Sequence, residues 1–98
     1  VWEMHEPWTH AKAMIPEPPS TYFTGRIFGC FTDDQHGLAS LGELGTDNIC
    51  FEVDYPHSDT TWPHSKDYVE KLAANLEPDV LYKILRGNAI AMLSLDRV

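Results

Sequence analysis

Two short apolar runs constrain the fold of this chain more than any other feature. The first is "RIFGCF", residues 26–31, and the second lies in "NICFEVD", residues 48–54. Both are rich in aromatic and β-branched residues, and neither shows a regular alternation of apolar and polar positions. This pattern is typical of strands that are buried on both faces of a sheet. We therefore expect two buried strands.

The segment between the two runs predicts a helix. Asp33 or Asp34 can cap its first turn, and Gly45 suits its C-terminal end. Three leucines between these positions fall on one helical face: Leu38, Leu41 and Leu44. A strand, a crossover helix and a second strand make a parallel βαβ unit, which is nearly always right-handed. The expected fold class is therefore α/β.

Helical periodicity returns after the second run, where Pro63 is tolerable in a first turn. The apolar residues at helical spacing are Val69, Leu72, Ala73 and Leu76. "EPDVLYKILRG" predicts a further short helix, with Pro78 near its start and Gly87 past its end. "NAIAMLSLD" predicts a last turn or two. These elements complete a βαβα pattern.

The N-terminal residues have a different composition. Pro16, Pro18 and Pro19 argue against a helix and favour an extended connector. We expect a single domain over residues 1–98, with an extended arm at 1–25 and a βαβα core at 26–98. The chain also lacks an initiator methionine, which favours either a piece of a longer protein or a chain whose first residues are missing from this sequence.

The charge balance excludes some partners. Fifteen acidic residues against seven basic ones give a net charge of −8. Binding of phosphate groups needs a basic face, so we expect neither nucleic acid nor an anionic membrane as a partner. We interpret the acidity as a source of solubility. No apolar stretch is long enough to span a membrane, and the first ten residues do not form a signal peptide.

The two cysteines, Cys30 and Cys50, lie inside the two apolar runs and form no C-x-x-C motif. Free buried cysteines are common in cytosolic proteins, whereas small secreted domains usually carry more cysteines in disulfides. We therefore expect two buried free thiols and a cytoplasmic location.

Asp54 follows the second apolar run directly, and ligands of parallel α/β folds bind at the carboxyl ends of strands. Pro56 cannot donate to a ladder, so strand pairing should stop there. The connection over residues 54–62 is long for such a fold, and long loops at this rim often carry function. A carboxylate here could bind a metal, take a proton from water, or do both. Alternatively, it caps the loop by accepting from backbone N–H groups.

The same residues carry a resemblance. "FEVDYPHSDTTWPHS" at 51–65, followed by "KILRGNAIAMLSLD" at 83–96, resembles the C-terminal end of the amidohydrolase-related family. "PPSTYFTGRIFGCFTDD" at 18–34 resembles the family's approach to its seventh strand. This family contains metal-dependent hydrolases and decarboxylases on a (β/α)8 TIM barrel. The resemblance implies that the chain forms the last two β/α units of such a barrel, incomplete as an isolated chain.

The resemblance also implies roles for single residues. Asp54 would be the catalytic acid and metal ligand of strand eight, and His57 would lie at the mouth of the substrate pocket. Asn88 and Ala89 would belong to a structural segment that closes the barrel. The parent enzyme would use a divalent ion, zinc or manganese, to activate a water that attacks a carbonyl-type small-molecule substrate. Alternatively, the parent is a decarboxylase of the same family.

The chain departs from the family pattern in its count of metal ligands. It holds two of eight strands and no His-x-His pair. One aspartate cannot hold a catalytic zinc, which needs about three protein ligands. We therefore expect the isolated chain to bind metal weakly and to be inactive, or to be a truncated non-catalytic module. The remaining histidines are interpreted as surface, loop or helix residues: His5, His10, His36 and His64. The tryptophans are interpreted as packing groups: Trp2, Trp8 and Trp62.

A sheet of two apolar strands also bears on assembly. Such a sheet is marginal by itself, and unpaired edges are templates for another chain. We therefore expect a homo-oligomer, most simply a two-fold dimer that joins the sheets edge to edge or swaps the proline-rich N-terminal arm. Alternatively, the helices and the N-terminal arm of a monomer cover both faces of its sheet.

Overall fold

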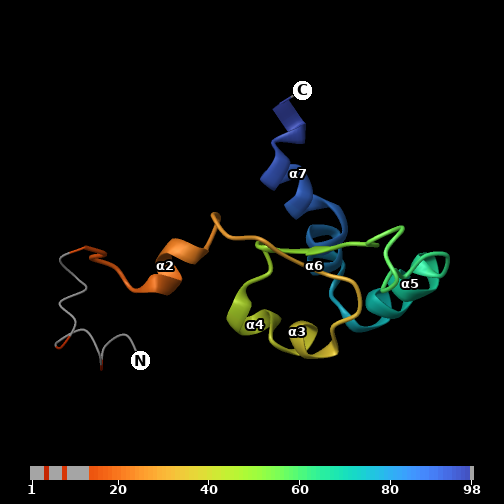
Figure 1. The fold of residues 1–98 in the computed structure, drawn as a ribbon, viewed down its shortest axis with the longest axis horizontal. Coiled ribbons are helices and arrows are strands. Elements are labelled where there is room, and N and C mark those ends of the chain that lie inside the picture. The colour runs from red at the N-terminus through yellow and green to blue at the C-terminus, as the bar shows by residue number, and fades with distance from the viewer. Residues whose placement is uncertain (1–3, 5–7, 9–13, 98) are drawn as a thin grey trace.

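The computed structural model describes residues 4, 8 and 14–97. Its sheet consists of two parallel strands, β1 (Gly29–Phe31) and β2 (Ile49–Phe51), which pair Gly29 with Ile49, Cys30 with Cys50 and Phe31 with Phe51. The predicted parallel pair is therefore present within a mixed α/β arrangement (Figure 1). Each strand is shorter than the apolar run that predicts it.

Two short helices replace the single predicted crossover helix. They are α3 (Gln35–Ala39) and α4 (Leu41–Leu44), and the break falls at Ser40. The predicted cap is present, because the Asp34 carboxylate accepts a hydrogen bond of 2.8 Å from the N–H of Gly37. Gly45 ends α4 with a φ of 85°, a left-handed value that glycine adopts without steric cost.

The C-terminal part forms α5 (Ser65–Asn75) and then one continuous helical stretch. This stretch comprises α6 (Pro78–Tyr82), a π-helical turn η2 (Lys83–Gly87) and α7 (Asn88–Leu93), and a 3-10 turn η3 (Leu95–Arg97) follows. The prediction that a helix ends before Gly87 is wrong. Gly87 lies inside the helix with helical backbone angles, and its missing side chain leaves room for the ring of Tyr82.

The prediction of an extended arm over residues 1–25 is wrong in one part. Pro19–Phe23 form the helix α2, which extends away from the sheet (Figure 1). Pro19 stands at the start of this helix, where a proline needs no N–H partner and its fixed φ is already helical. Most of the arm before Met14 lies outside the described residues.

The hydrophobic core lies on one face of the sheet, where four elements meet. Phe31 of β1, Leu41 of α4, Leu72 of α5 and Ile84 of η2 are all buried and in one cluster. Phe51 packs beside them: its ring makes an edge contact with Phe31 at 5.9 Å between centroids. The helices therefore cover the sheet face that carries Phe31 and Phe51.

The opposite face differs from the sequence prediction. Because side chains alternate along a strand, Cys30 and Cys50 point away from the two phenylalanines. Cys50 is buried, but Cys30 is exposed. The expectation that both strands are buried on both faces is therefore wrong for β1, because the described residues do not cover Cys30.

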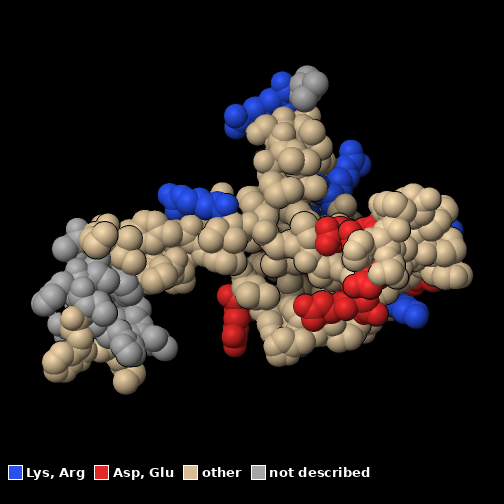
Figure 2. Space-filling model, viewed as in Figure 1, with Lys and Arg blue, Asp and Glu red and all other residues tan. Residues whose placement is uncertain are grey.

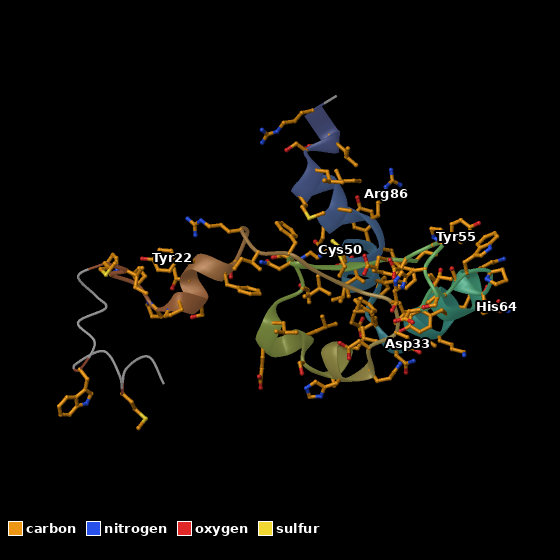
Figure 3. All side chains as sticks on the ribbon, in the orientation of Figure 1. Tyr22, Asp33, Cys50, Tyr55, His64 and Arg86 are labelled. Carbon is orange, nitrogen blue, oxygen red and sulfur yellow. The ribbon has the colours of Figure 1, made fainter. Side chains whose placement is uncertain are left out.

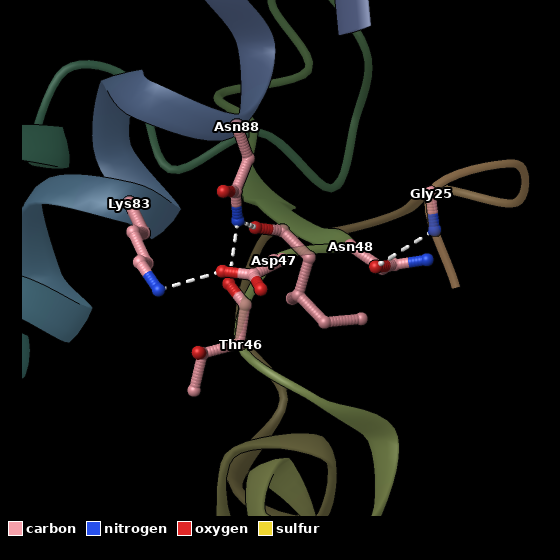
Figure 4. Close-up of polar contacts among 7 residues, drawn as sticks. Gly25, Thr46, Asp47, Asn48, Lys83 and Asn88 are labelled. Carbon is pink, nitrogen blue, oxygen red and sulfur yellow. Dashed lines mark hydrogen bonds and ion pairs between the residues drawn. The ribbon is translucent and has the colours of Figure 1, made fainter. Parts of the chain in front are cut away.

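Two buried asparagines hold the sheet to its surroundings, and Figure 4 shows the bonds that Asn88 makes. The Asn48 side chain donates to the carbonyls of Phe23 and Ile27, at 3.1 and 2.7 Å. The Asn88 side chain donates to the carbonyls of Thr46 and Ile49, both at 2.7 Å. Asn48 thus fixes the approach to β1, and Asn88 fixes the C-terminal helix to β2. This contact agrees with the structural role that the family resemblance implies for Asn88.

The ladder shows which edge of each strand is open. The N–H of Gly29 donates to Asn48 and the N–H of Glu52 donates to Phe31, each at 2.9 Å. Backbone groups alternate in direction along a parallel strand, so those of Cys30 and Ile49 point to the outer edges. The Ile49 carbonyl at its outer edge is bound by Asn88. The outer edge of β1 therefore remains the more open of the two.

The chain is less compact than a typical globular domain of its length. Its radius of gyration is 16.8 Å, whereas a compact domain of this length has about 13 Å. Large exposed apolar side chains occur on several elements, including Ile27 before β1 and Leu93 at the end of α7. In the part of the chain that the structure describes, no helix has the length and apolar character needed to cross a membrane.

Candidate functional site

The loop between β2 and α5 is folded back on itself. Its two ends are tied together, because the Thr60 hydroxyl donates to the Val53 carbonyl at 2.6 Å and the N–H of Thr61 donates to the same carbonyl at 3.3 Å. The rings of Tyr55 and Trp62 meet edge to face, with centroids 5.8 Å apart. Figure 3 shows Tyr55 at the same end of the molecule as His64, the residue before α5. The loop therefore presents a defined surface beyond the carboxyl end of β2.

Asp54 lies in this loop, three residues after the end of β2. Its backbone is left-handed, with a φ of 57°, a conformation that few residues other than glycine and asparagine or aspartate adopt. The N–H of His57 donates to the Asp54 carbonyl at 2.8 Å, which closes a turn. That turn places Nδ1 of His57 3.3 Å from Oδ2 of Asp54, with the two side chains 66% and 44% exposed.

The carboxylate of Asp54 does not serve as a loop cap within the described residues. No backbone N–H of residues 14–97 donates to it, whereas the Asp34 carboxylate makes such a bond to Gly37. The contact that Asp54 makes is with the imidazole of His57. A carboxylate that keeps free acceptor positions can bind a cation or take a proton from water. This arrangement favours the chemical interpretation of Asp54 over the capping one.

A groove of about 430 Å³ lies beside the loop, on the side of α5. It is lined by three carboxylates, two threonines, a histidine, a tyrosine and a lysine: Asp33, Asp59, Asp67, Thr60, Thr61, His64, Tyr68 and Lys71. Acidic side chains also gather between α3 and α5 in the space-filling view (Figure 2). Asp54 and His57 are not among the lining residues, so the expected place of His57 at a pocket mouth stays a prediction.

One side of this groove is fixed by a contact between α5 and the loop after β1. The hydroxyl of Tyr68 donates to Oδ1 of Asp33 at 3.0 Å, and its ring stacks on Phe51 with centroids 5.6 Å apart. Burial, and next the hydrogen bond and negative charge of Asp33, raise the pKa of Tyr68 to about 12. The sequence shows no signal for this contact, because the partners are 35 residues apart.

The remaining histidines and the tryptophans can be compared with the positions that the sequence predicts for them. His36 lies in the first turn of α3, and His64 stands just before α5, as expected. The imidazole of His64 forms a second histidine–aspartate pair, 3.7 Å from Asp67. Trp62 packs against Tyr55, but Trp8 is 85% exposed, so its interpretation as a packing group is wrong. His5, His10 and Trp2 lie outside the described residues.

The donors of a metal site are incomplete in this part of the chain. Among the described residues, no group of three or more His, Cys, Asp or Glu side chains could hold a metal ion. Asp54 and His57 supply one oxygen and one nitrogen donor at a shared position. A catalytic zinc needs about three protein ligands, so the described residues do not complete such a site.

Comparison with known proteins agrees with the motif that surrounds this loop. No curated protein matches the chain. A model of the amidohydrolase family, however, matches residues 2–95, which cover nearly the whole sequence. The match includes both strands, the loop with Asp54 and His57, and the C-terminal helix with Asn88. The chain therefore belongs to the amidohydrolase family.

Proposed function

We propose that this chain forms the last two β/α units of a (β/α)8 barrel enzyme. The enzyme would hydrolyse a carbonyl-type small-molecule substrate, and the carboxylate of Asp54 would activate the attacking water. Family membership indicates a hydrolase-type or decarboxylase-type function that depends on a divalent metal. In this proposal β1 is the seventh strand of the barrel and β2 is the eighth. The observation that carries it is the position of Asp54 beyond β2, with its carboxylate beside His57.

The arrangement of the sheet supports a place within a barrel. In such a barrel each strand has a neighbour on both edges, helices cover the outer face, and inward side chains fill the interior. The helices here pack against the face of Phe31 and Phe51, which corresponds to the outer face. The face of Cys30 would then be the inner one. The exposure of Cys30 is what the absence of facing strands would leave, whereas Cys50 on the same face is buried.

Asp54 has the properties that a general base needs. Its carboxylate is accessible to water, and the left-handed backbone turns it out of the strand direction. The carboxylate would take a proton from the attacking water. His57 would hold the carboxylate in place through the contact at 3.3 Å. Active sites of barrel enzymes lie at this carboxyl-terminal rim of the strands.

The metal that the family generally uses would need more ligands than the described residues offer. Asp54 and His57 are donors of the kinds that zinc binds, but they are fewer than the protein ligands of known catalytic sites. We therefore propose that the isolated chain binds zinc weakly and does not turn over substrate. Elemental analysis after dialysis against zinc would show less than one zinc per chain, and one tightly held zinc per chain would contradict this.

Steady-state kinetics on a complete barrel enzyme of the family test the role proposed for Asp54. In such an enzyme, the aspartate that matches Asp54 would be replaced by asparagine. This keeps the shape of the side chain but removes the proton acceptor, so we expect kcat/KM to fall by roughly 10²–10⁴. Activity within a few-fold of the unsubstituted enzyme would contradict the role of Asp54. Carbon dioxide among the products would indicate the decarboxylase instead of the hydrolase.

A further inference from the structure

The two cysteines are register partners on neighbouring strands. Cys30 of β1 pairs with Cys50 of β2 in the parallel ladder. Register partners share one face of a sheet, and neighbouring strands lie about 4.8 Å apart. Disulfide-bonded cysteines have Cα atoms about 4.4–6.8 Å apart, with side chains that point toward a common region. The Cα atoms of the two cysteines therefore lie at a separation that suits a disulfide bond.

The two thiols differ in access to solvent. Cys30 is exposed on the face opposite the hydrophobic core, whereas Cys50 is 4% exposed. A reagent in solution would therefore meet Cys30 first, and Cys50 would lie behind it as a second thiol on the adjacent strand.

A carboxylate lies next to the exposed thiol. Glu52 follows Cys50 by two residues on β2, so it points to the same face. Burial raises the pKa of Cys30, and the negative charge and hydrogen bonding of Glu52 raise it further. Burial raises the pKa of Cys50, and its proximity to Cys30 adds to this. Since the thiolate is the reactive form, both groups should react slowly at neutral pH and faster as the pH rises.

We propose that Cys30 and Cys50 form a dithiol modification site that small soluble disulfides, such as oxidised glutathione, convert into a disulfide bond between β1 and β2. In the first step the Cys30 thiolate attacks one sulfur of the small disulfide. Its S–S bond breaks, a mixed disulfide forms on Cys30, and the leaving thiolate takes up a proton. In the second step the Cys50 thiolate attacks the sulfur of Cys30 and releases a second small thiol.

Atoms and electrons balance over the two steps of this reaction. The two protein thiols lose two hydrogen atoms and two electrons, and one small disulfide is reduced to two thiols. The exposed position of Cys30 allows the first attack, and the register with Cys50 allows the second. The site depends on the two strands and on an open face at Cys30, as this chain has it. In the complete barrel proposed above this face is the inner one, so the test uses the 98-residue chain itself and is independent of any hydrolase activity.

The test is to incubate the chain with oxidised glutathione and then to block the remaining free thiols with an alkylating agent. Mass spectrometry then measures the mass of the product. We expect the unsubstituted chain to lose two hydrogen atoms, to gain no glutathione and to resist alkylation. The Cys50→Ala variant should stop at one glutathione on Cys30. The Cys30→Ser variant should remain unmodified while it is folded, because Cys50 is buried.

Three results would overturn the proposal. They are a stable glutathione adduct on Cys30 of the unsubstituted chain, a disulfide between two chains, and equal reactivity of Cys50 in the Cys30→Ser variant. The Glu52→Gln variant supplies a further readout, since removal of the negative charge should lower the pKa of Cys30. Its disulfide should form several-fold faster at neutral pH, and an unchanged rate and pH profile would contradict the position of Glu52 beside the thiol.

Discussion

Nδ1 of His57 lies 3.3 Å from Oδ2 of Asp54, and the two side chains stay largely accessible to solvent in the loop after β2. An exposed pair of this kind contributes at most about 1 kcal/mol to stability. The pair therefore adds little to stability, and the role proposed for Asp54 is chemical. A second pair of the same spacing, His64 with Asp67 at 3.7 Å, provides a matched control for experiments on the first.

The left-handed backbone of Asp54 predicts a conflict between stability and function. Glycine adopts this conformation without the steric cost that other residues have, but it also loses more backbone entropy on folding. Asp54→Gly should therefore raise the free energy of unfolding by at most about 1 kcal/mol. Ser94 has a similar φ of 53°, and Ser94→Gly should have the same effect. Chemical denaturation of both variants provides the measurement. A clear loss of stability in Asp54→Gly alone would show that its carboxylate holds the loop together.

Asn88 is predicted to be one of the most important polar residues for stability. Asn88→Ala would leave the partly buried carbonyls of Thr46 and Ile49 without their side-chain donor. We expect a loss of roughly 2–4 kcal/mol in the free energy of unfolding, because each unsatisfied buried group costs about 1–3 kcal/mol. Asn75 is the matched control, since it makes one exposed bond, to Lys71. Equal effects of Asn75→Ala and Asn88→Ala in urea denaturation would contradict the anchoring role.

Local signals in the sequence predicted the local features of the fold well. Asp34 caps α3 and Gly45 ends α4, because a cap and a left-handed glycine depend on a few neighbouring residues. Gly87 was misleading, since whether a helix stops at glycine depends on distant packing. Here Asn88 binds to β2, and the helix continues past Gly87.

The candidate site was predictable only in part. The position of Asp54 after an apolar run pointed to the rim loop, but its contact with His57 needed the turn geometry. Pairs far apart in sequence, such as Tyr68 with Asp33, left no signal. The exposure of Cys30 could not be foreseen because burial of a strand depends on which neighbours cover it.

Alkaline titration tests the contact between Tyr68 and Asp33. The pKa of Tyr68 is raised to about 12 in the folded chain, whereas an unperturbed tyrosine has a pKa near 10. A raised pKa means that the neutral form is favoured by folding. The contribution of Tyr68 to stability is therefore complete below about pH 10 and is lost as the pH rises toward 12.

The absorbance of the tyrosinate ion should show one late step among the four tyrosines. This step should be absent in Tyr68→Phe, and the stability of that variant should fall less steeply at alkaline pH. Tyr22→Phe is the control, since Tyr22 lies in α2, away from the groove. A late step that persists in Tyr68→Phe would assign the raised pKa to another residue.

The open edge of β1 predicts self-association. The backbone groups of Cys30 point outward, whereas the Ile49 carbonyl at the edge of β2 is bound by Asn88. We propose that two chains pair through their β1 edges about a two-fold axis, which gives a four-stranded sheet. Light scattering should then give twice the monomer mass of 11.1 kDa.

A proline at the open edge tests this arrangement. Cys30→Pro removes an outward N–H and leaves the ladder to β2 intact, because edge strands tolerate proline. The folded variant should be monomeric. A monomer of the unsubstituted chain at every concentration would contradict the dimer, as would a dimer that survives in the proline variant.

We propose Asp54 as the general base of an amidohydrolase-family barrel, and steady-state kinetics on a chimera test this role most directly. Residues 26–98 would replace the last two β/α units of a complete family barrel whose substrate is known. The chimera should retain activity, Asp54→Asn should lower kcat/KM by roughly 10²–10⁴, and Asp67→Asn should leave it within a few-fold. A folded chimera without activity, or equal rates for the two variants, would contradict the account.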